Sequence, residues 1–555
     1  MSEYRSYRAP SENHSRLCVP ELDSLGPSIL ENRRQFESSS CRWLDIPLTK
    51  IRTWAQNDTL QLATDFTRRY WSSESSCESI LSGARSPKSA SICPLILSGH
   101  QPELFHPGVW FKNFLLSSLA KQHSGIGVNI LVDHDLSRNF ALQVPSITDN
   151  GQLTKEQVSI DDEWHGKPWE LTWPKDISRW KDFLASIVMK LQTVGNLDPL
   201  IVKLWPNVIH ALEQGKPVGE VLASARHIFE LSNGLQTLEL PFSQLASERS
   251  FACFAGEILS RIETVHDVYN SARNDYRSHH GIKNHLQPIP ELGRDKDWFE
   301  TPFWIYSATD PMRRPLWVCR KSGQLRLSDR RNWTIDFPET KEFEPWFTQW
   351  KKLLDSKFYV RPRALTTTMF LRLAVGDLFI HGIGGGKYDQ MTDRIIESLW
   401  PICSPKYLVA TATLYLPIKM DGRATLNESQ PAERDVLQKI RHWRFTPERL
   451  LNGVEESTKV HSLLCEKESL LAKIPLRTEK IAWHRELQNL NSRLRQHCQE
   501  SEESLSHQLR NAIIFDRNQA ILASREFSIS IFPSTSIVMN LLRLCPPTKV
   551  EILNC

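Results

Sequence analysis

The sequence has no apolar run long enough to cross a membrane. A membrane-spanning helix needs about 20 consecutive apolar residues, and no stretch of the 555 residues approaches that length. The first residues, Met-Ser-Glu-Tyr-Arg, also lack the apolar segment of a secretory signal peptide. We therefore expect a cytoplasmic protein that does not engage a membrane.

Clustered cysteines are missing as well. Eleven cysteines are scattered between Cys18 and Cys555, and no two of them form a Cys-x-x-Cys pair. Structural zinc sites need clustered ligands, and disulfide frameworks are typical of small secreted domains. The scatter indicates reduced thiols and gives no metal site, while the need for a divalent metal stays open.

An excess of charge of one sign is also absent. The 68 Lys and Arg residues nearly balance the 64 Asp and Glu residues, and the net charge is +4. This balance, together with the lack of a long basic block, argues against nucleic acid as a partner. The sequence does contain 40% hydrophobic residues and 18 tryptophans, enough for several cores. At about 150 residues per domain, its length suggests three or four units.

Short apolar runs in the first third of the chain predict a parallel sheet. Residues 94–97 form an apolar run that stops at Ser98-Gly99-His100, and residues 128–132 form a second run. Between them, residues 109–120 carry apolar side chains at helical spacing. Uniformly apolar runs bounded by glycine are typical of buried parallel strands, so this region predicts a β-α-β unit.

The sheet pattern returns far along the chain, at residues 377–381 and 407–416. We therefore predict an α/β fold, in which a Rossmann-like core with a parallel sheet is split by a long α+β insertion. Beyond residue 446, leucines recur at helical spacing on two segments that Pro475 separates, which indicates a C-terminal α-helical coiled-coil arm. The predicted parts are a mostly helical N-terminal extension (1–90), the first part of the core (91–145), an inserted connecting region with helices and a hairpin (146–360), the second part of the core (361–425), a helical coiled-coil hairpin (445–525) and a C-terminal tail that packs on the core (526–555).

The end of the first predicted strand carries candidate phosphate-binding residues. Gly99, His100 and Gln101 follow this strand, and His106 stands near the start of the next helix. Ligands of α/β sheets bind at the carboxyl ends of strands, and helix N-termini attract anions. Lys112, one turn into the helix, would add a positive charge. A tight turn with capping histidines is the structural alternative.

Asp133-His134-Asp135 ends the second predicted strand. Two carboxylates beside an imidazole can orient it, raise its pKa and make it a base. The same oxygens could hold a divalent cation, or the triplet could be a polar strand exit or a helix cap. Because neighbouring parallel strands end at one edge of the sheet, we expect the triplet to lie near His100.

A glycine-rich segment follows the third predicted strand, from His381 to Lys387. Gly384, Gly385 and Gly386 lack side chains, so we expect a loop whose backbone N–H groups approach a phosphate, with Lys387 adding charge and the helix beginning near Asp389. The spacing is not that of a Walker A loop, since no Ser or Thr follows the lysine. A flexible turn is the alternative.

Two arginines flank Pro362 just before the core resumes. Arg361 and Arg363 could clamp a carboxylate through paired N–H groups. Surface arginines without a ligand are the alternative. We predict Arg361 as a substrate-binding residue.

These motifs, in this order, resemble the bacillithiol-synthesis cysteine ligase family. That family has a Gly-Gln-Gln strand-loop-helix with a lysine in the helix, a strand that ends in Asp-His-Asp, and a long insertion with a hairpin. An Arg-Pro segment, a glycine-containing strand-helix loop and a coiled coil follow. The matching positions here are Gly99-His100-Gln101 with Lys112, Asp133-His134-Asp135, Phe303–Tyr306 with Leu316–Leu327, Arg361-Pro362 and Leu378–Tyr388.

The resemblance is loose over residues 93–420 and architectural over 447–525. His100 stands where the family has Gln, and the segment 382–387 is richer in glycine, which marks a divergent branch. The resemblance implies a core related to nucleotidyl-transferase and tRNA-synthetase catalytic domains, a homodimer formed through the coiled coil, and the joining of cysteine to an amino-sugar conjugate.

We therefore expect a ligase that forms a C–N bond on a small molecule bearing a carboxylate, with ATP or ADP as a nucleotide ligand. His100, Asp133, His134 and Asp135 are the expected catalytic residues, with His134 as the acid–base group. Residues 384–387 would bind the anionic group. Two alternatives stay open: a non-catalytic nucleotide- or metabolite-binding scaffold that dimerises through its coiled coil, and a nucleotidyl transferase.

Overall fold

The core of the molecule is a six-stranded sheet. In the computed structural model, the described residues are 4–71, 93–137, 140–148, 152–160, 166–195, 198–284, 289–418, 432–451 and 458–547. Neighbouring strands of the sheet are parallel, except that the edge strand β1 runs antiparallel to β16. The spatial order is β1 (Ser15–Val19), β16 (Leu408–Thr413), β15 (Leu378–His381), β4 (Leu95–His100), β5 (Ile126–Leu131) and β8 (Leu238–Pro241). The predicted α/β fold with a parallel sheet is confirmed at this level.

Apolar side chains cover both faces of this sheet. Along β4, Leu95 and Leu97 belong to one buried cluster, whereas Ile96 belongs to another. Successive residues of a strand point to opposite faces, so an uninterrupted apolar run needs a helical layer on each side. The first layer contains α2 (Leu48–Arg68), α9 (Arg249–Ser260), α10 (Ile262–His279) and α13 (Ile383–Leu399). The second contains α1 (Leu25–Glu37), α4 (Pro107–Gln122), α5 (Ile177–Gln192), α6 (Ile201–Glu213), α7 (Val218–Ser232) and α18 (Ser534–Arg543).

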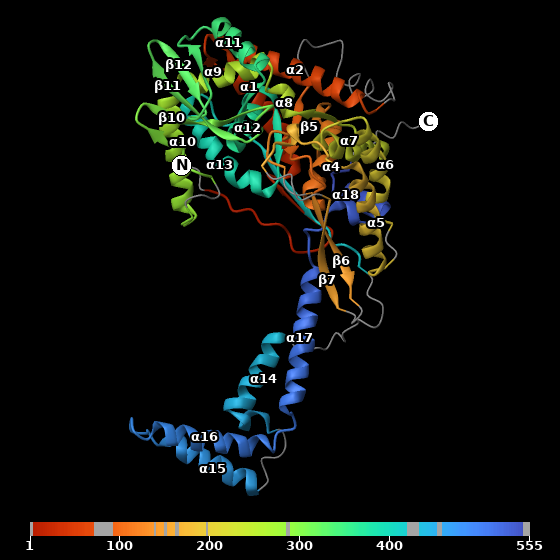
Figure 1. The fold of residues 1–555 in the computed structure, drawn as a ribbon, viewed down its shortest axis with the longest axis vertical. Helices are drawn as coiled ribbons and strands as arrows, with labels where there is room; N and C mark the ends of the chain where they lie inside the picture. Colours follow the sequence, from red (N-terminus) through yellow and green to blue (C-terminus); the bar gives the residue numbers. More distant parts are fainter. Residues whose placement is uncertain are drawn as a thin grey trace.

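A second, antiparallel sheet packs beside the first layer (Figure 1). Its order is β13 (Thr334–Pro338), β12 (Gln324–Ser328), β11 (Arg314–Lys321), β10 (Trp298–Ser307) and β14 (Phe358–Pro362), and β9 (Arg294–Asp295) pairs with β10. The predicted hairpin is β11–β12, where Ser322 and Gly323 both adopt positive φ in the turn. The helices α11 (Phe343–Asp355) and α12 (Ala364–Phe370) precede and follow β14.

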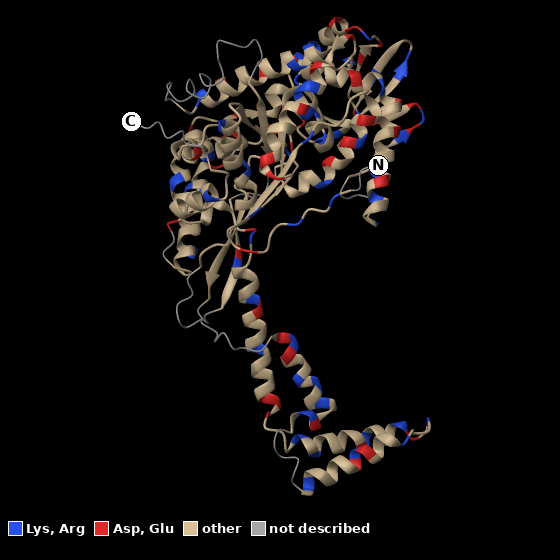
Figure 2. Cartoon of the chain, turned by 180° about the vertical axis from the view of Figure 1, so that it is seen from behind, with Lys and Arg blue, Asp and Glu red and all other residues tan. Residues whose placement is uncertain are grey.

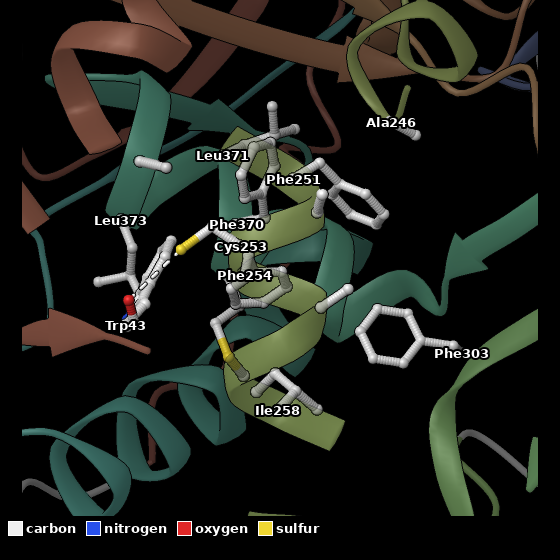
Figure 3. Close-up of a cluster of buried hydrophobic side chains, with 14 of the residues drawn as sticks. Trp43, Ala246, Phe251, Cys253, Phe254, Ile258, Phe303, Phe370, Leu371 and Leu373 are labelled. Atoms are coloured by element: carbon white, nitrogen blue, oxygen red, sulfur yellow. Dashed lines mark hydrogen bonds between the residues drawn. The ribbon is translucent and has the colours of Figure 1, made fainter. Parts of the chain in front are cut away.

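Aromatic rings join the second sheet to the helices (Figure 3). Phe251 of α9 meets Phe303 of β10 and Phe370 of α12 edge-on, with centroid separations of 6.3 and 5.2 Å. Cys253 of α9 donates a hydrogen bond to the backbone oxygen of Trp43, at 3.4 Å. Buried aromatic side chains remove large apolar areas from water, so this cluster fixes the second sheet against the core.

The C-terminal helices project from the body as an arm (Figure 1). The arm contains α14 (Glu433–Phe445), α15 (Thr458–Ala472), α16 (Lys480–Arg495) and α17 (Glu502–Leu522), and Figure 2 shows basic and acidic residues interspersed along it. The predicted interruption at Pro475 separates α15 from α16. The described residues show no coiled coil, because a second break, capped by Ser501, divides the expected long helix into α16 and α17.

Two edge strands come from outside the ranges predicted for the core. β1 lies in the predicted N-terminal extension, and β8 lies in the predicted insertion. β8 has four residues, too few to show a period in the sequence. Residues 72–92, 419–431 and 548–555, which include parts of the predicted extension, core and tail, lie outside the described residues. None of the helices in the described ranges combines the length and the apolar character needed to cross a membrane.

Candidate functional site

A cavity of about 870 Å³ lies at the carboxyl ends of β4 and β15. β4 and β15 are neighbours in the sheet. From β4 the chain passes through α4 to β5, toward one edge of the sheet, and from β15 it passes through α13 to β16, toward the other edge. The two connections diverge at this point, so the strand ends open a crevice, the usual position of ligands in α/β sheets. The cavity brings together Gly99, His100, Gln101, His106, Lys112, His134, Asp135, His381, Gly384, Gly385 and Lys387.

Basic side chains outnumber acidic ones in the wall of this cavity. Among the described residues, its lining includes one carboxylate, that of Asp135, and ten basic side chains: Arg8, Lys112, Arg313, Arg363, Lys387, Arg525, His100, His106, His134 and His381. Such an excess of basic groups in a low-dielectric recess favours an anionic ligand. This imbalance does not show in the net charge of the whole chain.

Two helices begin at the cavity wall. His106 caps α4, because its Nδ1 accepts a hydrogen bond from the backbone N–H of Gly108 at 3.1 Å. Gly382 occupies the cap position of α13. The first N–H groups of a helix lack partners within the helix and carry partial positive charge, so both ends add to the attraction for an anion.

The glycine segment is not the predicted loop. The helix α13 begins at Ile383, so Gly384, Gly385 and Gly386 lie in its first turn. A Cβ at Gly386 would stand 2.4 Å from a methyl group of Val409, whereas open space surrounds Gly384. Gly386 is therefore glycine because α13 packs closely on β16, and it does not line the cavity.

His381 lies at the end of β15 beside a buried carboxylate. Its Nε2 is 2.9 Å from Oδ2 of Asp389, and both side chains are almost fully buried. Asp389 also pairs with Arg372 and accepts a hydrogen bond from Oγ1 of Thr368 at 2.6 Å. Burial lowers the pKa of His381, and the Asp389 carboxylate opposes that shift. Sequence reasoning missed Asp389, although it follows His381 by eight residues.

Lys112 is the most deeply buried cation of the wall. Its Nζ donates a hydrogen bond to the backbone oxygen of Gly99 at 2.8 Å. Burial lowers the pKa of Lys112 to about 7, so the amine gains a proton readily when an anion enters. Lys112 lies inside α4, as predicted, and its amine reaches the end of β4.

The ring of His100 is fully engaged by the protein. Its Nδ1 is 2.9 Å from the backbone oxygen of Gln101, and its Nε2 is 3.2 Å from Oδ1 of Asn113. Burial, together with Lys112 and Arg226, holds the pKa of His100 well below its ordinary value. This geometry suits a side chain that shapes the wall better than one that exchanges protons.

The Asp133-His134-Asp135 triplet is divided by the fold. Asp135 pairs with Arg313 at 2.9 Å and accepts from Nε2 of Gln101 at 2.9 Å. The Nε2 of His134 faces Oγ1 of Thr367 at 3.3 Å, and burial lowers the pKa of His134 to about 3. Neither neighbouring carboxylate takes a hydrogen bond from the His134 ring.

Asp133 and Arg361 lie outside the cavity, in a group that we name the Arg361 cluster: Asp133, Glu170, Ser243, Tyr306 and Arg361. Arg361 binds both carboxylate oxygens of Glu170, at 3.0 Å each, and the Tyr306 hydroxyl donates to Glu170. Asp133 accepts from the backbone N–H and the hydroxyl of Ser243. Burial and the charge of Glu170 raise the pKa of Asp133 to about 7.

Arg363 takes the place in the cavity that was predicted for Arg361. The strand β14 ends at Pro362 and the chain then turns into α12, so the two arginines point to different sites. The guanidinium of Arg363 lies 4.1 Å from the ring centroid of Trp304, and that of Arg313 lies 5.0 Å from it. Trp304, Arg313, Arg525, Tyr7 and Arg8 have no sequence motif that links them to the site.

In the described part of the chain, no group of three or more His, Cys, Asp or Glu side chains is arranged to hold a metal ion. The cavity wall is instead suited to phosphate or carboxylate groups.

No protein-family model matches the sequence, and no curated protein matches it.

Proposed function

We propose that the cavity binds a small molecule carrying phosphate or carboxylate groups, and that the protein is a ligase that forms a C–N bond on such a molecule. The six Lys and Arg side chains that line the cavity beside the single carboxylate Asp135 carry this proposal. A ligase of this kind holds an activated carboxylate and an amine together, and positively charged groups stabilise the developing charge of the leaving group. The resemblance to the cysteine-adding ligases suggests cysteine, or a similar amino acid, as the amine.

A nucleoside triphosphate would fit the same wall. The N-termini of α4 and α13, with Lys112 and Lys387, are suited to its phosphates. When bound, the nucleotide would supply the chemical activation of the substrate carboxylate. ATP, with ADP as its product, is the nucleotide we propose.

We propose the tip of the arm as the surface through which two copies pair. Phe445, Ile474, Leu476 and Ile481 are 65%, 95%, 67% and 76% exposed; Ile474 and Leu476 lie between α15 and α16, and Ile481 lies in the first turn of α16. Exposed apolar side chains gathered in one place are typical of interaction surfaces. Light scattering of the full chain should give the mass of a dimer, and the I474D/I481D double variant should give that of a monomer.

Calorimetry tests the ligand class. Inorganic phosphate, ATP and ADP should bind the full-length protein, and phosphate should compete with ATP. No binding of any of the three would contradict the proposal.

A coupled assay then tests the reaction. Incubation with ATP, cysteine and a panel of amino-sugar conjugates should release phosphate or pyrophosphate and form an amide. Binding without turnover on the whole panel would instead identify a metabolite-binding scaffold. Pyrophosphate release with no amide would identify a nucleotidyl transferase.

A further inference from the structure

We propose that His381 is the base of this reaction, with Asp389 as the positioning residue that leaves the Nδ1 of His381 open to the cavity. The inference rests on the proposed function for the reaction itself. Its structural part concerns the state of one imidazole ring and can be measured without a substrate.

The charge of Asp389 biases where the His381 ring carries its hydrogen. Oδ2 of Asp389 lies 2.9 Å from Nε2 of His381, off the line of a hydrogen bond, and the negative charge of the carboxylate favours the proton on this nitrogen. Nδ1 then keeps its lone pair. Arg372 and Thr368 hold the carboxylate in place from two further sides. Burial opposes ionisation of Asp389, but Arg372 and His381 hold its pKa below the ordinary value.

Gly385 lies beside the Nδ1 of His381 and has no side chain to block that nitrogen. A Cβ at this position would stand 2.9 Å from Nδ1 of His381, closer than a side chain can approach. Gly385 itself lines the cavity, in the first turn of α13. Glycine weakens a helix, so its presence here matches the need to keep the ring nitrogen accessible.

The other two buried histidines of the wall lack this arrangement. Both ring nitrogens of His100 face oxygen atoms of the protein. His134 faces a threonine hydroxyl, and the oxygens of Asp135 bind Gln101, Arg313 and the backbone N–H of Leu136 instead. Among the described residues that line the cavity, His381 is thus the histidine that a carboxylate orients from within the core.

The step can be written with its proton. The amine nitrogen bonds to the carbon of the activated carboxylate as the C–O bond to the leaving phosphate group breaks. The leaving group takes the bonding electron pair, and the proton of the nitrogen moves to Nδ1 of His381. The imidazolium that forms is stabilised by the Asp389 carboxylate, as in other carboxylate–histidine pairs.

Several charged or titratable groups face His381. Asp389 comes from α13, Arg372 from the π-helical turn Leu371–Val375 and Lys112 from α4, and the ring of Tyr407, just before β16, lies 4.9 Å from the imidazole. Lys112 and Arg372 lower the pKa of His381, while Asp389 raises it. Removal of the Asp389 charge should therefore lower the pKa of the imidazole.

NMR of the full-length protein with ¹⁵N-labelled histidine tests the structural part, and H381Q identifies the signals. In the wild type, His381 should carry its proton on Nε2, and inorganic phosphate should shift Nδ1. D389N should lower its pKa and mix the two tautomers, whereas the surface variant D336N should change neither. A proton on Nδ1 in the wild type, or no response to D389N, would overturn the proposal.

Turnover tests the catalytic part. H381Q should lose about 100-fold or more in kcat, and D389N about tenfold or more, with phosphate affinity within about twofold of the wild type. G385A should resemble H381Q, while the exposed H210Q should behave as the wild type. Wild-type turnover by H381Q would overturn this proposal and leave the ligase assignment intact. If the wild type itself shows no turnover, the ligase assignment fails and the NMR experiment alone decides the state of His381.

Discussion

The cavity and the Arg361 cluster lie at the same edge of the same sheet but differ in charge balance. The cavity lies beyond β4 and β15, and its ten basic side chains face one carboxylate. The Arg361 cluster lies beyond β5 and β8, and there Arg361 and Tyr306 bind Glu170 while Ser243 binds Asp133. Asp133, Glu170, Ser243 and Arg361 line a smaller cavity of about 390 Å³, in which Arg361 and Glu170 already neutralise each other. The surplus of basic over acidic side chains in the cavity wall separates the two regions, although Arg313, Arg363 and Arg525 also pair with Asp135, Glu300 and Glu526.

The largest expected effect is in the Arg361 cluster. Arg361→Ala leaves Glu170 buried without its cation, so we expect the free energy of unfolding to fall by about 3–5 kcal/mol. Urea denaturation followed by circular dichroism measures this loss. Arg326→Ala, which removes a comparable two-point pair with Asp336 on the surface, is the control and should cost much less. Equal losses in the two variants would remove the distinction between the buried cluster and an ordinary surface pair.

The second effect is in the cavity. Lys112→Met keeps the length of the side chain and removes its charge, so we expect the affinity for inorganic phosphate to fall at least about tenfold. Isothermal titration calorimetry measures the affinity. Lys121→Met, near the far end of the same helix and exposed, is the matched control and should bind phosphate as the wild type does. Unchanged affinity in Lys112→Met would show that this cation does not serve a ligand.

The smallest effect is a pH dependence. The pKa of Asp133 is about 7 in the folded protein and near 3.8 in the unfolded chain, so the folded state binds more protons between these values. Stability should therefore fall as pH rises from about 4 to about 7. In Asp133→Asn this fall should be smaller by at least about 1 kcal/mol. Urea titrations at a series of pH values measure it, and parallel profiles for both proteins would contradict the inferred protonation of Asp133.

The residues nearest the predicted strand ends were foreseeable. Gly99, His100 and Gln101 reach the cavity because apolar runs fix where a buried strand stops, and His381 reaches it for the same reason. Lys112 was foreseeable from helical spacing. The placement of Asp133 and His134 in different regions could not be predicted. Alternate residues of a strand point to opposite sides, and the neighbouring elements decide which side faces a cavity.

Contacts between distant segments could not be predicted. Arg372 reaches Asp389 from the turn before β15, and Trp304 brings Arg313 and Arg363 together from the second sheet. The edge strands β1 and β8 joined the core without a signal of their own, since short strands at a sheet edge carry no period.

The sequence by itself determined the strands β4, β5, β15 and β16 and the helix α4, because these depend on apolar patterning and on local punctuation by glycine and proline. Only the tertiary structure decided which charged side chains neutralise one another and which remain facing a cavity. Ion pairing depends on distances between segments that are far apart in the chain, and residue order does not specify those distances. For this reason Asp133 lies in the Arg361 cluster while His134 and Asp135 line the cavity. The glycine segment forms the first turn of α13, beside the imidazole of His381.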